Sequence, residues 1–160
     1  MLGILNYFSK NIYNLLKENL KGQTIEEINK IEEIRIRSNG IIEIKYSDKS
    51  NIINARIKYE DILETLQIIC ENSIYSYQNE ICNGYITVRG GHRIGITGNC
   101  VIENGRVINI KYISSINFRI ARQIIGCSNK VLRYILDLEN NTIYNTLIIS
   151  PPGVRKNNVT

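Results

Sequence analysis

Strict alternation of apolar and polar residues, interrupted by short turn signals, limits what this chain of 160 residues can fold into. Residues 33–37 read Glu-Ile-Arg-Ile-Arg, and apolar residues alternate again over residues 42–46. Successive side chains of a strand point to opposite faces, so this pattern predicts two strands that are each buried on one face. Asn39-Gly40 between them is the turn signal of a β-hairpin.

The same pattern returns in the middle of the chain. Gly90-Gly91 and Asn104-Gly105 are further hairpin signals, and each lies between two runs of alternating residues. The strands predicted in this way cover residues 33–37, 42–46, 52–57, 85–89, 93–102, 107–110 and 115–121. We therefore expect an antiparallel meander.

Helical spacing of apolar residues predicts helices beside this meander. An amphipathic helix is expected over residues 2–22, and a short capped turn over residues 24–30, where Thr24 and Glu27 have the spacing of a capping box. A third helical pattern runs from residue 59 to about residue 81, with a break at Asn72-Ser73. Helices beside an antiparallel sheet define an α+β domain.

Composition bounds the class of protein. With 43% hydrophobic residues the chain can bury a core, as one domain or one domain plus a fragment. We find no signal-peptide pattern and no apolar run near the roughly 18 residues of a membrane span. The four cysteines form no C-x-x-C pair, which fits reduced cytosolic thiols rather than a zinc site.

Positive charge concentrates in residues 84–135, where eight basic residues face a single acid, Glu103, giving about +7. The basic residues are Arg89, Arg93, Arg106, Lys111, Arg119, Arg122, Lys130 and Arg133. Such a segment indicates an anionic partner, or simply a solvated surface. We find no aromatic-interleaved RNA motif and no helix-turn-helix pattern, so we expect no nucleic-acid partner.

A degenerate phosphate-binding loop follows. A helix is expected over residues 130–138, a turn over 139–141 and a strand over 142–150, which runs into Ser-Pro-Pro-Gly at 150–153. The P-loop pattern is G-x-x-x-x-G-K-S/T. Aligned on Lys156, its first glycine is Ser150, its second is Arg155 and its hydroxyl residue is Asn157.

A shift of the reading frame explains why residues 153–160 depart from the P-loop pattern. One legal back-translation of residues 153–160 is GGT GTG CGG AAA AAC AAC GTT ACT. Removing one G after the first codon gives Gly-Cys-Gly-Lys-Thr-Thr-Leu, an intact P-loop ending. We therefore expect a one-base insertion and a chain that breaks off inside a nucleotide site. The strand before it would then lie exposed, without neighbouring strands.

The ordered motifs resemble the stage III sporulation protein AA family. These motifs are E-I-R-I-R at 33–37, G-Y-I-T-V-R-G-G-H-R-I-G-I-T-G at 84–98, S-S-I-N-F-R-I-A-R at 114–122 and S-P-P-G at 150–153. The family comprises ATPases of endospore-forming bacteria, similar to hexameric secretion ATPases. The resemblance implies an N-terminal α+β domain, residues 1–125, and the truncated first helix and strand of a RecA-like α/β ATPase domain, residues 126–160.

The resemblance also implies the function and the partners. Such proteins use ATP and Mg and are thought to energise the channel between mother cell and forespore from the mother-cell cytoplasm. A homo-oligomeric ring and membrane-associated sporulation proteins are the implied partners. Because the loop is degenerate, we expect this chain to bind no nucleotide and to act in oligomerisation or docking. A functional ATP-binding protein and a small basic nucleic-acid-binding module are the alternatives.

Three groups of site residues follow, and none is assigned a catalytic or metal-binding role. The degenerate loop contributes Ser150, Pro151, Pro152, Gly153 and Lys156; the R-x-x-R segment contributes Arg119 and Arg122 as interface arginines; and the hairpin tip contributes Gly90, Gly91, His92 and Arg93 as a contact. Arginines in related rings can face nucleotide at a subunit boundary. A salt bridge or a solvated strand face is the alternative for the arginines, and a turn-forming role is the alternative for the tip.

Overall fold

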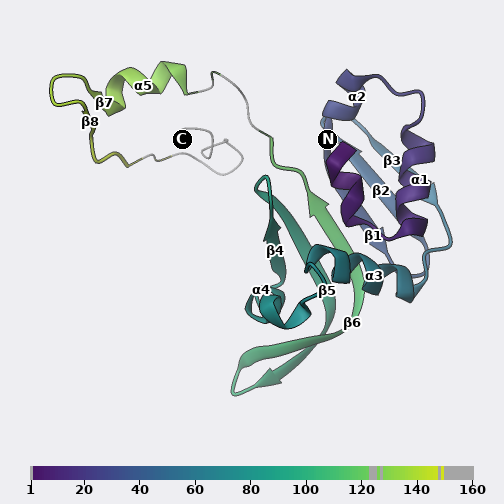
Figure 1. Cartoon of the computed structure of the whole chain (residues 1–160). Helices are drawn as coiled ribbons and strands as arrows, with labels where there is room; N and C mark the ends of the chain where they lie inside the picture. Colours follow the sequence, from purple (N-terminus) through teal and green to yellow (C-terminus); the bar gives the residue numbers. More distant parts are fainter. Residues whose placement is uncertain (1, 123–125, 127, 148, 150–160) are drawn as a thin grey trace. The chain divides into compact units, whose positions relative to one another are not determined.

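The computed structural model describes residues 2–122, 126, 128–147 and 149 (Figure 1). The chain divides into two compact units between Ala121 and Arg122. The boundary predicted between residues 125 and 126 adjoins residues 123–125, which are outside the described part, so it stays a prediction. In that described part, no helix is both long and apolar enough to cross a membrane.

The first unit is built on a six-stranded antiparallel sheet in the order β3-β2-β1-β6-β5-β4. Its strands are β1 (Ile31–Arg37), β2 (Ile41–Tyr46), β3 (Ser50–Asn54), β4 (Tyr85–Val88), β5 (His92–Glu103) and β6 (Arg106–Arg119). Two three-stranded meanders join where β1 pairs with β6. The predicted α+β fold with an antiparallel meander is therefore confirmed.

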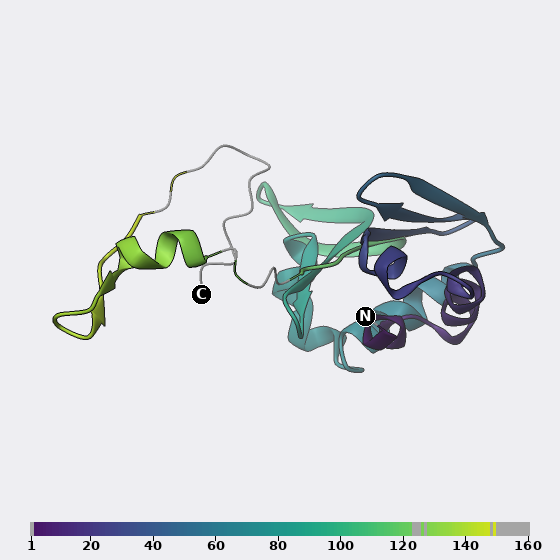
Figure 2. The same ribbon diagram turned by 90° about the horizontal axis from the view of Figure 1, so that it is seen from above.

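Helices lie on one side of this sheet (Figure 2). They are the 3₁₀ helix η1 (Leu2–Tyr7), α1 (Lys10–Leu20), α2 (Ile25–Asn29), α3 (Tyr59–Ile69), the 3₁₀ helix η2 (Ile74–Tyr77) and α4 (Gln78–Cys82). The capping box predicted from Thr24 and Glu27 is present at α2. Alternate strand residues point at the helices and are buried, among them Ile34, Ile36 and Phe118. The ring of Tyr7, the last residue of η1, packs on the Phe118 ring with a centroid distance of 5.6 Å, and the ring of the next residue, Phe8, does so at 5.4 Å.

Two predicted helices are interrupted. The first is split at Ser9, whose backbone is extended and whose amide donates a hydrogen bond to Thr65 Oγ1 at 3.0 Å, so that α3 fixes the break. The pattern over residues 59–81 is split after α3, where Glu71 and Asn72 have φ of 50° and 63°. A right-handed helix cannot pass through two residues with positive φ.

β5 and β6 form one long hairpin. The sequence predicted a slightly shorter strand over residues 93–102 in place of β5, and two separate strands over residues 107–110 and 115–121 in place of β6. The register shifts between Thr97 and Asn99, and Tyr112 on β6 has a φ of 48°. Gly98 lies at this bulge against the backbone of β6: an added Cβ would approach Lys111 O to 2.7 Å and Ile113 Cα to 3.0 Å. The absence of a side chain at Gly98 therefore lets one strand continue through the irregularity.

The second unit contains α5 (Asn129–Ile135), β7 (Leu136–Asp137) and β8 (Thr142–Ile143). The helix predicted over 130–138 ends three residues earlier. Of the strand predicted over 142–150, the described residues form a strand only at β8, which pairs antiparallel with β7; residues 148 and 150 lie outside the described part. Asp137 explains the turn, because its carboxylate accepts hydrogen bonds from the Asn140 backbone and side-chain nitrogens. Leu147 and Ile149 beyond β8 are each 84% exposed.

Gly98→Ala tests the close approach at the bulge. The added methyl group meets backbone atoms that cannot rotate away, so we expect a loss of about 1–3 kcal/mol in the free energy of unfolding, measured by urea denaturation. Gly40→Ala is the matched control, because an added Cβ there has no neighbour within 4 Å. Equal stability of the two variants would contradict this account.

Candidate interaction face

The sheet has a second, polar face that points away from the helices. Strand pairing aligns its residues in rows: Glu43, Arg35, Asn117, Gly95 and Tyr85 form one row across β2, β1, β6, β5 and β4. A neighbouring row contains Lys45, Glu33, Arg119, Arg93 and Thr87. Arg37 belongs to a third row, opposite Ser115 on β6. We call this polar side of the six-stranded sheet the open face.

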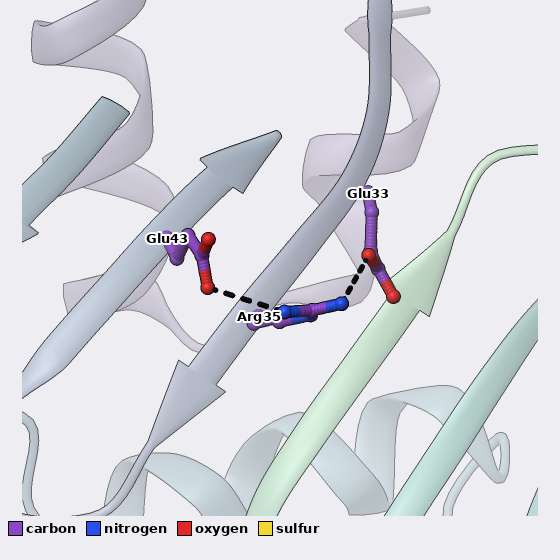
Figure 3. Close-up of polar contacts among 3 residues, drawn as sticks. All are labelled: Glu33, Arg35 and Glu43. Atoms are coloured by element: carbon purple, nitrogen blue, oxygen red, sulfur yellow. Dashed lines mark hydrogen bonds and ion pairs between the residues drawn. The ribbon is translucent and has the colours of Figure 1, made fainter. Parts of the chain in front are cut away.

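On the β1 and β2 strands of the open face, Arg35 is held between two carboxylates (Figure 3). Its Nη2 lies 2.8 Å from Glu33 Oε2, and its Nη1 lies 3.4 Å from Glu43 Oε2. Hydrogen bonding and charge from Glu33, and then charge from Glu43, raise the pKa of Arg35 above its ordinary value. The Glu33 side chain is only 10% exposed, so Arg35 keeps a nearly buried carboxylate compensated.

The other arginines of the open face are not neutralised in this way. Arg37, Arg93 and Arg119 are exposed, and none of them makes an ion pair within the described residues. Arg93 and Arg119 lie directly opposite each other on β5 and β6, an arrangement of like charges that destabilises a sheet. The Arg93 guanidinium carbon lies 5.9 Å from the centre of the Tyr85 ring, which supports that side chain without cancelling its charge.

Asn117 adds an unsatisfied acceptor between these groups. It stands in the row between Arg35 and Gly95, and its Oδ1 is buried without a hydrogen-bond partner among the residues that the structure describes. Buried polar atoms normally have a partner, and exceptions often mark a site where a ligand or solvent completes the bonding. Within the described part of the chain, the centre of the open face is therefore incompletely bonded.

The glycine-rich hairpin tip has a structural task. His92 is the first residue of β5, and its Nδ1 accepts a hydrogen bond of 3.0 Å from the backbone amide of Ala121, where the chain leaves the first unit. Its ring packs on Phe118 with centroids 5.9 Å apart. Gly90 and Gly91 have φ of 88° and 75°, values that favour glycine. Burial lowers the pKa of His92, in keeping with a neutral ring that accepts a hydrogen bond.

The predicted site residues are thus only partly visible. Arg119 and Arg93 lie together on the open face, whereas His92 forms the clasp at Ala121 and Gly90 and Gly91 form the turn before it. Arg122 is half-buried and begins the second unit, so its position relative to Arg119 is not defined. The predicted loop residues all lie outside the described part of the chain; they are Ser150, Pro151, Pro152, Gly153 and Lys156.

Sequence reasoning missed Glu33, Arg35, Glu43 and Asn117. A signal for the triad was available, because the Asn39-Gly40 turn fixes a register that places Arg35 opposite Glu43. No such local signal existed for Asn117 or for the Arg93–Arg119 pair. Their neighbours follow from the pairing of β6 with β1 and β5.

The fold and the open face define the class of protein: an α+β domain with one sheet face covered by helices and one basic face uncovered. The chain matches the family described as "Sporulation stage III, protein AA" over residues 4–160 and belongs to that family. It is 36% identical over 153 residues to the stage III sporulation protein AA of Bacillus subtilis (strain 168). That match covers 96% of this chain and 48% of the relative, so the chain spans about half of the relative's length. The resemblance inferred from the motifs is confirmed.

A solved structure is also similar. The VirB11 ATPase from the Brucella suis type IV secretion system, in complex with sulphate, superimposes with a TM-score of 0.45 at 11% sequence identity. The similarity covers 83% of this chain and 36% of that one.

Arg35→Met tests the compensation of Glu33. It keeps much of the apolar stem and leaves a nearly buried carboxylate without its partner, so we expect the free energy of unfolding at pH 7 to fall by about 1–3 kcal/mol. Arg37→Met is the control on the same strand, where the side chain is exposed and a change within about 0.5 kcal/mol is expected. A similar loss in both variants would mean that Glu33 does not depend on Arg35.

His92→Leu and His92→Asn test the clasp at Ala121. Leucine keeps apolar bulk but removes the acceptor, so the Ala121 amide should exchange its hydrogen about tenfold faster or more by NMR. Asparagine places Oδ1 at the branch position of Nδ1 and should retain part of the protection. Equal exchange in the wild type and in His92→Leu would show that the hydrogen bond does not form in solution.

The same histidine predicts a pH dependence. Because the folded pKa lies below the ordinary 6.5, the unfolded chain takes up the proton first as the pH falls. The stabilisation is complete above that value and is lost as the pH drops through the lower folded pKa. Between pH 7.5 and 5 the wild type should therefore lose more stability than His92→Leu in urea titrations. A parallel decline in both proteins would contradict the assignment.

Proposed function

We propose that this chain provides the oligomerisation and docking domain of a stage III sporulation protein AA. The observation that carries the proposal is the open face, where Arg37, Arg93 and Arg119 are exposed and lack ion pairs within the described residues. A sheet face that is needed only for folding would not place two arginines opposite each other. An anionic surface brought against this face would relieve that repulsion.

The proposal places the domain within the role implied by its family. The whole protein would act as a ring-forming ATPase that powers the channel between mother cell and forespore. It would work in the mother-cell cytoplasm and reach the forespore membrane through membrane-associated sporulation proteins. Arg119 and Arg122, the arginines of the R-x-x-R segment, would then serve subunit contacts. The docking domain would supply the contacts and the ATPase domain the energy.

ATP and Mg belong to the family's activity in this proposal, but we propose that this chain binds neither. Arg155 stands where the P-loop pattern has a glycine, and Asn157 stands where it has the hydroxyl residue that ligates magnesium. A side chain at the glycine position obstructs the close approach of backbone amides to phosphate. We therefore propose that this chain makes protein–protein contacts and does not hydrolyse ATP.

Sedimentation velocity of the full 160-residue chain over a wide micromolar range tests the proposal. We expect concentration-dependent species larger than the monomer, unchanged by magnesium and ATP, and weakened by salt because exposed charges are screened. A fluorescent ATP analogue should show no saturable binding in the presence of magnesium. A strict monomer would overturn the oligomerisation role, and saturable nucleotide binding would favour the alternative of a working ATP-binding protein.

A separate measurement tests whether the basic face binds nucleic acid, the alternative reading of this charge. Glu33 and Glu43 stand among the arginines and would repel a phosphate backbone. We therefore expect no binding to a non-specific duplex at low salt. Binding that falls steeply as salt rises would instead make the open face a nucleic-acid surface.

A further inference from the structure

We propose that the open face receives the exposed acidic stripe of helix α3 from a second copy of this chain. The stripe consists of Glu60, Glu64, Gln67 and Glu71. This inference rests on the proposed oligomerisation role and names the two surfaces that would meet.

The stripe is a defined helix face. At about 100° per residue, Glu60, Glu64 and Gln67 fall within a narrow sector of α3, and Glu71 follows after the helix ends at Ile69. The buried residues of α3, Ile62, Thr65, Leu66 and Ile69, fall on the opposite sector. All four stripe residues are exposed, and its three carboxylates make no ion pair within the described residues. Two acids without an ion pair among the described residues, Glu60 and Glu64, therefore point away from the core on α3, and a third exposed acid, Glu71, follows the helix.

The open face offers an excess of the opposite charge, although Glu33 and Glu43 also lie on it beside Arg35. Arg93 and Arg119 lie side by side on the paired strands β5 and β6. Arg119 is paired with Glu33 of β1, and Arg37 is exposed four residues further along the same strand. Arg35 is already held by Glu33 and Glu43, so it is not counted among the free charges. Three unpaired arginines thus stand on one side of the domain and three unpaired acids on the other.

The closest charges of the two sets have comparable spacings. With a rise of 1.5 Å per residue, Glu60 and Glu64 lie about 6 Å apart along the helix. On the sheet, Arg93 and Arg119 are cross-strand neighbours about 5 Å apart, and Arg37 lies about 14 Å from Arg119. Each surface therefore presents one close pair of like charges and a third charge outside that pair.

The two surfaces lie on opposite sides of the same domain. α3 packs its apolar sector toward the buried face of the sheet and contacts β6, whereas the arginines point from the other face. One copy can therefore use both surfaces at once, giving a head-to-tail contact between different patches. Such heterologous contacts close into rings or continue as open chains.

Charge reversal tests this pairing by sedimentation velocity on the full chain. Arg93→Glu/Arg119→Glu should weaken self-association at least tenfold, and Glu60→Arg/Glu64→Arg should do the same, because each brings like charges together. Mixing the two variants restores opposite charges at one junction, so the mixture should form a heterodimer that neither variant forms alone. Lys10→Glu/Lys21→Glu, an equal change in net charge on exposed lysines of the helical side, should leave association unchanged.

The outcomes separate this inference from the proposed function. Self-association that survives both reversals, or a mixture that stays monomeric, would overturn the pairing while leaving oligomerisation intact. A wild type that is monomeric throughout would overturn both. Thermal unfolding of every variant checks that it is folded, and Arg93→Gln/Arg119→Gln, which removes charge without reversing it, should weaken association less than reversal does. Equal weakening by both would indicate loss of packing rather than of charge pairing.

Discussion

The pairing of β1 with β6 is the contact on which the first unit depends. It runs from Glu33 opposite Arg119 to Arg37 opposite Ser115, and it joins the two meanders into one sheet. Without it, each meander would expose the edge that it now pairs, and Phe118 would lose Ile34 as its strand neighbour. The same pairing creates the open face, because it brings the charges of β1 beside those of β6 and β5.

Local signals explain how much of this fold the sequence predicts. The turn dipeptides Asn39-Gly40 and Asn104-Gly105 predicted hairpins, because asparagine and glycine tolerate the positive φ that such turns require. The interruption of the first helix at Ser9 and the β-bulge at Gly98 were not predicted. They depend on Thr65 and on the β6 backbone, which are distant in sequence, and no periodicity reports such contacts.

The candidate site divides along the same line. Arg93, Arg119 and His92 were singled out from their motifs, but the partners that give them meaning come from tertiary pairing. His92 is attached to Ala121 by a hydrogen bond across the sheet, which makes the tip a clasp for the exit of the chain. Arg119 has Glu33 on one side and Arg93 on the other, an environment that no window of sequence around it contains.

The open face thus combines two kinds of arginine, and the contrast between them separates folding from contact. Arg35 has two carboxylates in reach and serves the stability of a nearly buried Glu33. Arg93 and Arg119 oppose each other, and neither makes an ion pair within the described residues, although both stand on strands inside the sheet. A local arrangement that costs stability is expected where a chain meets a partner. The exposed arginines that make no ion pair within the described part of the fold are therefore the best guide to where its interface lies.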